Sequence, residues 1–242
     1  MDLLNNFIFV ALPYVALTIF LIGTIYRYRG TKFKFSSLSS EFLEGKKLFW
    51  GTVPFHWGII VLFFGHLIAF LIPQAILAWN GNTVRLMILE ISAFVFGLSA
   101  FVGMMNLLVR RKTNPRIEVV TSKMDLLIEV ILIVEIFLGL WIAYGFRWGS
   151  SWFTAVMAPY LSSIFVLNPQ IEAVSAMPFV IKLHVALAFV ILLLIPFTRL
   201  VHLLVFPLSY LWRPYQKVVW NWNRKKIRNP NAQWTITGSK NN

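Results

Sequence analysis

Cysteine is absent from this 242-residue sequence. Its absence excludes disulfide bonds, thioether-linked haem and cysteine-ligated iron–sulfur clusters. Charged residues are also scarce, at 13% of the chain, which is about half of their usual share in a soluble domain. Hydrophobic residues make up 58% of the chain. The composition therefore indicates a polytopic membrane protein rather than a soluble domain.

Acidic residues are the rarer of the two charged classes. The chain has 9 Asp and Glu residues against 22 Lys and Arg, which gives a formal net charge of +13. Such an excess also occurs in nucleic-acid-binding proteins. Here, however, the basic residues lie between and after apolar runs, as in the cytoplasmic loops of membrane proteins. We therefore expect lipid, and no nucleic acid, as a partner.

Five apolar runs are each long enough to cross a hydrocarbon core of about 30 Å. The sequence thus predicts an all-α protein with five transmembrane helices, at residues 7–26, 53–72, 86–109, 126–144 and 179–211. Pro54 suits the first turn of the second helix, and Pro73 should end or kink that helix. The fifth run is so long that a continuous helix must tilt strongly or project from the membrane.

The orientation follows from the basic residues. Most of the 22 Lys and Arg residues lie after the first run, after the third run and in the C-terminal tail. The positive-inside rule then places the N-terminus outside and the C-terminus inside. We predict a membrane domain over residues 1–211 and a basic cytoplasmic tail over residues 212–242.

Four histidines lie inside the apolar runs, where an ionisable side chain is costly and indicates a functional site. His56 and His66 belong to the second run, and His184 and His202 to the fifth. Antiparallel packing of these two helices pairs His56 with His202 and His66 with His184. The residue spacings correspond to about 15 Å on one helix and about 27 Å on the other, so the helices must cross or splay. Pro196 is a candidate for a bend between His184 and His202.

Two imidazole pairs between helices predict two metal centres, which we interpret as two b-type haems with these histidines as axial ligands. Coordination by imidazole from both sides suits electron transfer rather than oxygen binding. Gly58 and Gly65 are expected to leave room for the flat macrocycles. Arg199, one turn before His202, either pairs with a haem propionate or extends to the membrane surface.

A different class of function uses the same residues without haem. Single intramembrane histidines also serve as hydrogen-bonded structural residues or in proton relays. In this hypothesis the chain is a membrane anchor or proton-coupled transporter with His66, Glu135 and His184 as a relay. Glu135 is otherwise a carboxyl group that is neutral or paired with a neighbouring helix.

The residues around the histidines carry a family resemblance over about residues 1–220. The chain resembles the gamma subunit of membrane-bound respiratory nitrate reductase, a diheme cytochrome b of the prokaryotic cytoplasmic membrane. The motifs that carry the resemblance are Phe55-His56-Trp57-Gly58, Gly65-His66, Leu183-His184, Ile195 to His202, Arg110-Arg111 and Asn114-Pro115-Arg116.

The resemblance implies roles for individual residues. His66 and His184 would hold a distal, outer haem b, and His56 and His202 a proximal, inner haem b. Gly65 and Arg85 match positions associated with quinol binding. The family usually has lysine at the position of Arg85, whereas arginine keeps the charge but always stays protonated. Arg199 and Arg111 are candidate partners for the haem propionates.

The implied activity belongs to a complex. The family oxidises quinol near the outer face and passes electrons to an iron–sulfur subunit and a molybdenum catalytic subunit on the cytoplasmic side. The chain would then be a subunit of a quinol-dependent oxidoreductase whose terminal active site lies on a partner. The same module resembles membrane subunits of nitrite-oxidising and sulfite-reductase-associated complexes, so the terminal substrate and the direction of electron flow stay open.

Overall fold

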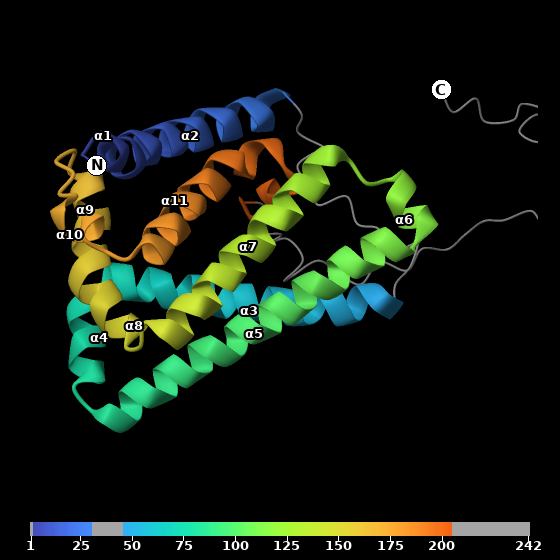
Figure 1. The fold of residues 1–242 in the computed structure, drawn as a ribbon. Coiled ribbons are helices and arrows are strands. Elements are labelled where there is room, and N and C mark those ends of the chain that lie inside the picture. The colour runs from blue at the N-terminus through green and yellow to red at the C-terminus, as the bar shows by residue number, and fades with distance from the viewer. Residues whose placement is uncertain (1, 31–45, 205–242) are drawn as a thin grey trace, which may run out of the picture. The chain divides into compact units, whose positions relative to one another are not determined.

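The computed structural model describes residues 2–30 and 46–204, and within these ranges it is helical and contains no strand (Figure 1). Five of the described helical segments are long and apolar enough to cross a membrane: Leu3–Gly30, Leu48–Leu71, Thr83–Thr113, Lys123–Gly145 and Phe179–Phe197. The predicted all-α fold with five transmembrane helices is therefore confirmed. The orientation of the termini stays a prediction, and the predicted boundary between residues 211 and 212 lies outside the described residues.

The described elements follow the chain in a simple order. The first half comprises α1 (Asp2–Asn6), the π-helix η1 (Phe7–Ala11), α2 (Leu12–Gly30), α3 (Lys46–Leu71), α4 (Pro73–Asn80), α5 (Thr83–Thr113) and α6 (Pro115–Val119). The second half comprises α7 (Lys123–Gly145), α8 (Gly149–Trp152), the π-helix η3 (Phe153–Met157), α9 (Ala158–Phe165), α10 (Glu172–Ser175), α11 (Phe179–Leu194) and the 3₁₀ segments η4 (Ile195–Phe197) and η5 (Arg199–Leu204).

Pro54 lies inside α3 and not in its first turn, so that expectation is wrong. A proline inside a helix lacks the N–H that would bond the carbonyl four residues earlier, here that of Trp50. Asn106 of α5 supplies a substitute, because its Nδ2 donates to the Trp50 carbonyl oxygen at 3.4 Å. The Oγ of Ser99 donates to the Pro54 carbonyl at 3.1 Å. Side chains of α5 thus compensate for the proline in α3.

Small residues allow α3 and α5 to pack closely where residues 51–62 meet residues 96–107, and the two helices separate toward α4 (Figure 1). A Cβ atom added to Gly58 would collide with the Phe96 carbonyl oxygen and with Ala100, and one on Gly103 would lie 2.5 Å from the Phe55 nitrogen. Such residues let helix backbones approach in membranes. Gly58 therefore serves helix packing, and the expectation that it leaves room for a macrocycle is wrong.

Substitution of Gly58 by alanine should destabilise the protein, because the added methyl group has no room against the α5 backbone. We expect a loss of about 1–3 kcal/mol, the usual cost of overpacking. Thermal denaturation of the detergent-solubilised protein measures the change. Gly65→Ala is a matched control on the same helix, since no atom lies within 4 Å of a Cβ built there. Equal melting temperatures for the two variants would contradict the packing role.

The fifth span is not one continuous helix through residue 204. Regular α-helix ends at Leu194, η4 follows, and Thr198 is extended before η5 begins. Pro196 accounts for the break, because its ring and its missing N–H interrupt the helical ladder. Arg27 of α2 donates through Nη1 to the carbonyl oxygens of Pro196 at 2.5 Å and Thr198 at 3.0 Å. The predicted bend at Pro196 is confirmed, and the expected unbroken helix over residues 179–211 is wrong for its described part.

The connection between the fourth and fifth spans is partly helical, and it forms a buried cluster with the first span. This cluster consists of Phe9, Met157, Tyr160, Ile164 and Val174. The Tyr160 hydroxyl donates to the Phe9 carbonyl at 2.8 Å, and the side chain of Tyr160 is 1% exposed. This bond ties the first span to the connection.

Burial raises the pKa of the Tyr160 phenol, and the nearby Tyr14 adds to the shift. Unfolded tyrosine titrates near pH 10. The contribution of the buried neutral phenol to the free energy of unfolding is therefore fully present below pH 10 and is lost as the pH rises toward the folded pKa. Tyr160→Phe should cost about 1 kcal/mol at pH 7, because the Phe9 carbonyl loses its donor. The variant should also lose less stability than the parent between pH 10 and pH 11. Thermal melting curves recorded at each pH measure both effects. The exposed Tyr144 provides the control Tyr144→Phe, whose melting curves should match those of the parent.

Candidate functional site

His56 of α3 and His202 of η5 lie together, as the sequence predicts. Their ring centroids are 6.2 Å apart, with an angle of 61° between the ring planes. The break at Pro196 precedes His202, so this histidine is positioned by a short 3₁₀ segment rather than by α11 itself. Both rings are partly buried.

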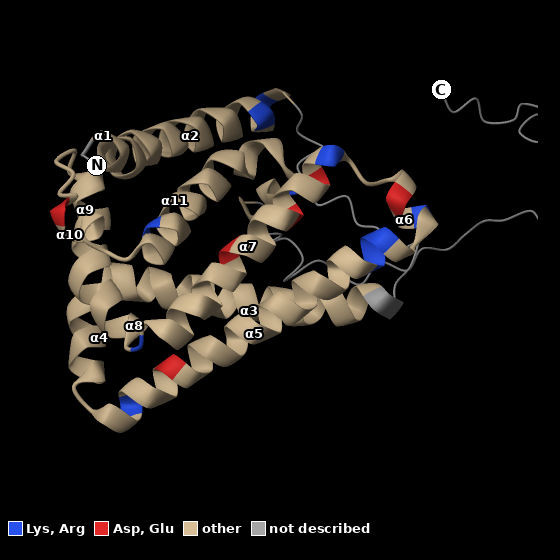
Figure 2. Cartoon of the chain, in the orientation of Figure 1, with Lys and Arg blue, Asp and Glu red and all other residues tan. Residues whose placement is uncertain are grey.

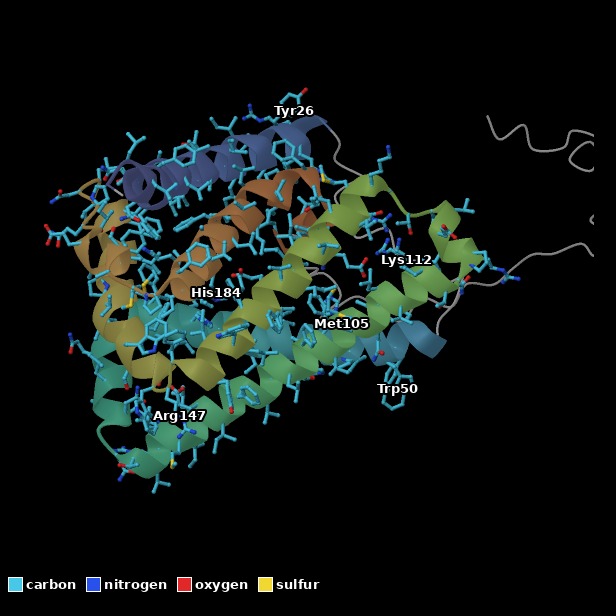
Figure 3. The ribbon with its side chains drawn as sticks, in the orientation of Figure 1. Tyr26, Trp50, Met105, Lys112, Arg147 and His184 are labelled. Carbon is cyan, nitrogen blue, oxygen red and sulfur yellow. The ribbon has the colours of Figure 1, made fainter. Side chains whose placement is uncertain are left out.

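The second predicted pair joins α3 to α11. His66 and His184 lie within electrostatic reach of each other. The ring of Phe153, the first residue of η3, meets the His66 ring edge to face at a centroid distance of 5.3 Å. On the α11 side, Figure 3 labels His184. Its Nδ1 lies 3.1 Å from Oε1 of Glu135 on α7. Elements from four parts of the chain thus surround this pair.

The Nδ1 atoms of the four rings all face protein oxygens. A carbonyl oxygen only accepts, so a ring nitrogen bonded to one carries the hydrogen, and the other nitrogen is left with a free lone pair. Three rings bond carbonyls of their own segment: His56 to Thr52 at 2.8 Å, His66 to Leu62 at 2.8 Å and His202 to Arg199 at 2.6 Å. The available ligand in each of these three rings is therefore Nε2.

This donor arrangement fits bis-imidazole coordination of a haem iron. A metal–nitrogen bond of about 2 Å plus about 1 Å from nitrogen to ring centre places two axial rings with centroids about 6 Å apart. The observed 6.2 Å between His56 and His202 agrees with that separation. An Nδ1–H donated to a protein oxygen is also the usual way in which a metal-binding histidine is fixed in orientation.

Arg111 and Arg199 belong to one charge cluster with two carboxylates of α7. Arg199 binds Asp125 through two bonds, Nε to Oδ1 at 2.6 Å and Nη2 to Oδ2 at 2.7 Å. Arg111 lies 2.8 Å from Glu129 through Nε and 3.9 Å from Asp125 through Nη1. Basic residues gather at this end of α5 and α7 (Figure 2). The cluster connects the segment of His202 to α7, whereas the propionate role of the two arginines stays a prediction.

No spacing in the sequence predicts a functional role for Asp125. Its side chain accepts from the Ser122 backbone N–H at 3.0 Å, and the Ser122 hydroxyl accepts from the Asp125 N–H at 3.1 Å. This capping box places the start of α7 at Lys123, three residues before the predicted start. The Ser-x-x-Asp pattern before an apolar run was the available signal, whereas the pairing with Arg199 was not visible in the sequence.

The two residues predicted for quinol binding lie on different helices. Gly65 of α3 is exposed and has open space beside it. Arg85 lies in the first turn of α5, with its guanidinium 5.2 Å from the centre of the Trp79 ring. The Nε1 of Trp79 in turn donates to the Arg85 carbonyl at 3.3 Å. The Trp79 ring thus holds the cation at the start of α5, and the quinol role stays a prediction.

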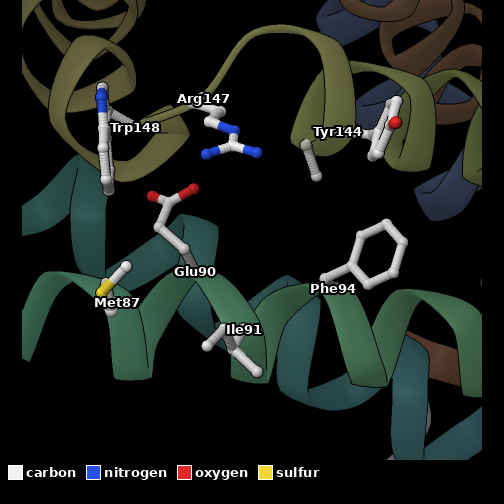
Figure 4. A pocket seen from close by; sticks show the side chains of 8 residues that line it. Met87, Glu90, Ile91, Phe94, Tyr144, Arg147 and Trp148 are labelled. Atoms are coloured by element: carbon white, nitrogen blue, oxygen red, sulfur yellow. The ribbon is translucent and has the colours of Figure 1, made fainter.

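A pocket of about 290 Å³ lies between α5 and the end of α7 (Figure 4). Its walls are mostly apolar, and Arg147 and Glu90 face each other across it (Figure 4). Glu90 accepts from the backbone N–H groups of Gly149 at 3.2 Å and Ser150 at 2.8 Å and from the Ser150 hydroxyl at 2.6 Å. This carboxylate therefore caps α8, and through α8 it fixes the segment that leads to Phe153.

Taken together, the fold and the site define a multi-pass membrane protein with two pairs of histidines between its second and fifth spans. In membrane proteins such pairs are suited to the ligation of haem.

Comparison with known proteins identifies the family. The family model described as nitrate reductase gamma subunit matches residues 5–221. The nitrate reductase gamma chain of Bacillus subtilis (strain 168) is 33% identical over 212 residues, which cover 84% of this chain and 93% of the relative. The respiratory nitrate reductase 2 gamma chain of Escherichia coli (strain K12) is 31% identical over 218 residues, or 89% and 96% of the two chains. The chain belongs to the nitrate reductase gamma subunit family.

This membership confirms the resemblance seen in the sequence and, with the five apolar helices, a multi-pass prokaryotic membrane protein. The relatives are gamma chains of nitrate reductase, an oxidoreductase with further subunits. A match of 29% identity over 229 residues to the nitrate reductase-like protein NarX of Mycobacterium tuberculosis covers 88% of this chain but 34% of that relative. A region similar to this chain therefore also occurs within a longer polypeptide.

Proposed function

We propose that this chain is the diheme cytochrome b subunit of a quinol-dependent, nitrate reductase-type complex. His66 and His184 hold the outer haem b, and His56 and His202 hold the inner haem b. The observation that supports the proposal most directly is the His56–His202 pair, whose 6.2 Å centroid separation and carbonyl-bonded Nδ1 atoms suit two axial ligands. Membership of the nitrate reductase gamma subunit family gives independent support.

Each haem, when bound, supplies a reversible one-electron centre within the membrane. The residues of this chain then have three tasks. The Nε2 atoms bind the iron, the Nδ1 bonds to Thr52, Leu62 and Arg199 orient the rings, and the apolar spans exclude water. A fixed ring orientation keeps both oxidation states in one geometry, which lowers the reorganisation that each electron transfer requires.

In this proposal, electrons move from the outer side of the membrane to the cytoplasmic side. Gly65 and Arg85 would bind quinol at the outer side, where its protons would be released. An iron–sulfur subunit and a molybdenum catalytic subunit would accept the electrons at the cytoplasmic side, where the basic residues of α5, α6 and α7 gather. Electrons moving toward a negative interior convert redox energy into membrane potential, at about 2.3 kcal/mol per charge per 100 mV.

A haem measurement tests this proposal. The complex is purified from membranes, and its reduced-minus-oxidised spectrum is combined with pyridine haemochrome quantification per gamma chain. We expect two haems b, both reducible by added quinol. A colourless preparation would overturn the proposal. A single haem would mean that one histidine pair is structural.

The 3.1 Å contact between His184 and Glu135 specifically favours one second candidate, a haem-free anchor with a His66–Glu135–His184 proton relay. The colourless outcome is the one that would support it.

Nitrite-oxidising and sulfite-reductase-associated complexes use a similar module, so the direction of electron flow has its own test. Potentiometric titration of the haems against menaquinone and ubiquinone distinguishes the two directions.

A further inference from the structure

His184 differs from the other three histidines in the group that faces its Nδ1. The other three rings bond a backbone carbonyl of their own segment. His184 instead faces a carboxylate from another helix, with its Nδ1 3.1 Å from Oε1 of Glu135 on α7, although the ring is not aligned for a regular hydrogen bond. The outer pair therefore has one ligand next to an acidic group and one next to a neutral group.

Glu135 lies in a costly position for a carboxyl group. Its side chain is 14% exposed and lies within a membrane-spanning helix. Among the described residues its other oxygen, Oε2, has no hydrogen-bond partner. A carboxyl group in an apolar span costs several kcal/mol unless a partner compensates for it. The His184 ring is the polar group that faces it.

Gly139, one turn further along α7, lies against the same ring. A Cβ atom added there would lie 3.4 Å from Cε1 and 4.0 Å from Nε2 of His184. Nε2 is the nitrogen that would bind the iron in the proposed ligation. Successive turns of α7 thus present an acidic oxygen to Nδ1 and a residue without a side chain to Nε2.

We infer that Glu135 is a positioning residue that orients His184 and adjusts the outer haem toward a lower midpoint potential. This inference rests on the proposed haem ligation. A carboxylate beside Nδ1–H fixes the tautomer and raises the basicity of the ring as a ligand. A more basic ligand stabilises ferric relative to ferrous iron. The inner haem, whose two ligands face only carbonyls, lacks this contribution.

Redox titration of the intact complex tests the inference through the Glu135→Gln variant. Glutamine keeps an oxygen beside Nδ1 and removes the acidic group. We expect both haems to be retained, the midpoint potential of the outer haem to rise and that of the inner haem to stay unchanged. The outer haem is identified as the one absent from His66→Ala. Glu129→Gln is the matched control on α7, because Glu129 pairs with Arg111 and should leave the outer haem unchanged.

Electron paramagnetic resonance separates the orientation of the ring from its basicity. Glu135→Leu removes the neighbouring oxygen as well, so its ferric outer-haem signal should shift, whereas the signal of Glu135→Gln should stay close to that of the parent. An unchanged outer potential in both variants, or an equal shift of both haems, would overturn the inference while leaving the haem ligands intact. If Glu135→Gln loses the outer haem, its retention in Glu135→Asp supports the role, and its loss from both variants contradicts it. A parent complex without haem would instead contradict the proposed function.

Discussion

Single alanine substitutions of the four histidines should remove the haems in a pairwise pattern. His66→Ala and His184→Ala should each eliminate the outer haem, and His56→Ala and His202→Ala the inner one. The reason is that, in the proposed ligation, each haem would depend on two histidines from different segments, so one remaining imidazole would leave it weakly held. Pyridine haemochrome content should fall from two haems to one in every variant, and low-temperature difference spectra show which haem remains.

Phe153→Leu is the control for this series. Phe153 contacts the His66 ring at 5.3 Å but supplies no ligand, so both haems should be retained. Loss of the same haem from His56→Ala and His66→Ala would contradict the pairing. Retention of two haems in any of the four alanine variants would remove that histidine from the ligand set.

Asp125→Ala should be the most destabilising substitution among the charged residues described. Asp125 is 5% exposed and binds Arg199 through two short bonds while it caps α7. Loss of one partner from a buried ion pair leaves an uncompensated charge and costs roughly 3–5 kcal/mol. Because Arg199 begins the segment that carries His202, the inner haem should be lost more readily than the outer one. Thermal denaturation with absorbance of each haem as the signal measures both effects.

Two comparisons make this prediction specific. Glu118→Ala removes an exposed carboxylate from the neighbouring α6 and should change the melting temperature little. Asp125→Asn keeps an oxygen for the cap of α7 but removes the charge opposite Arg199, so it should lie between the parent and Asp125→Ala. If Asp125→Ala melts together with Glu118→Ala, the charge cluster does not hold this region together.

The parts of the fold that the sequence predicted correctly depend on local patterns. Hydropathy over twenty residues is enough to locate a membrane span, because the backbone N–H and C=O groups of each span must form their hydrogen bonds within that span. The pairing of the histidines followed from their depth on two antiparallel helices, and the structure brings His56 and His202 together. The bend at Pro196 is equally local, since the proline ring alone interrupts the helix.

The parts that the sequence did not predict depend on contacts between distant segments. Pro54 is tolerated inside α3 because Asn106, fifty-two residues away, bonds the carbonyl that the proline leaves unpaired. Gly58 faces α5 rather than a cofactor because Phe96 and Ala100 approach it there. The pairing of Arg199 with Asp125 requires knowledge of how η5 meets α7. The residue spacing within a single helix does not reveal any of these contacts.

The bonds from Arg27 to the Pro196 and Thr198 carbonyls have a consequence for the biogenesis of the protein. Chains are made from the N-terminus and their parts fold as they emerge. Arg27 of the first span therefore cannot form these bonds until nearly all of the described chain has been synthesised. His202 follows these residues in the chain, so the inner histidine pair is completed only after the second, third and fourth spans have been synthesised. In the proposed ligation, haem delivered to the inner site during synthesis would find only His56, so its stable incorporation would follow translation of the last span.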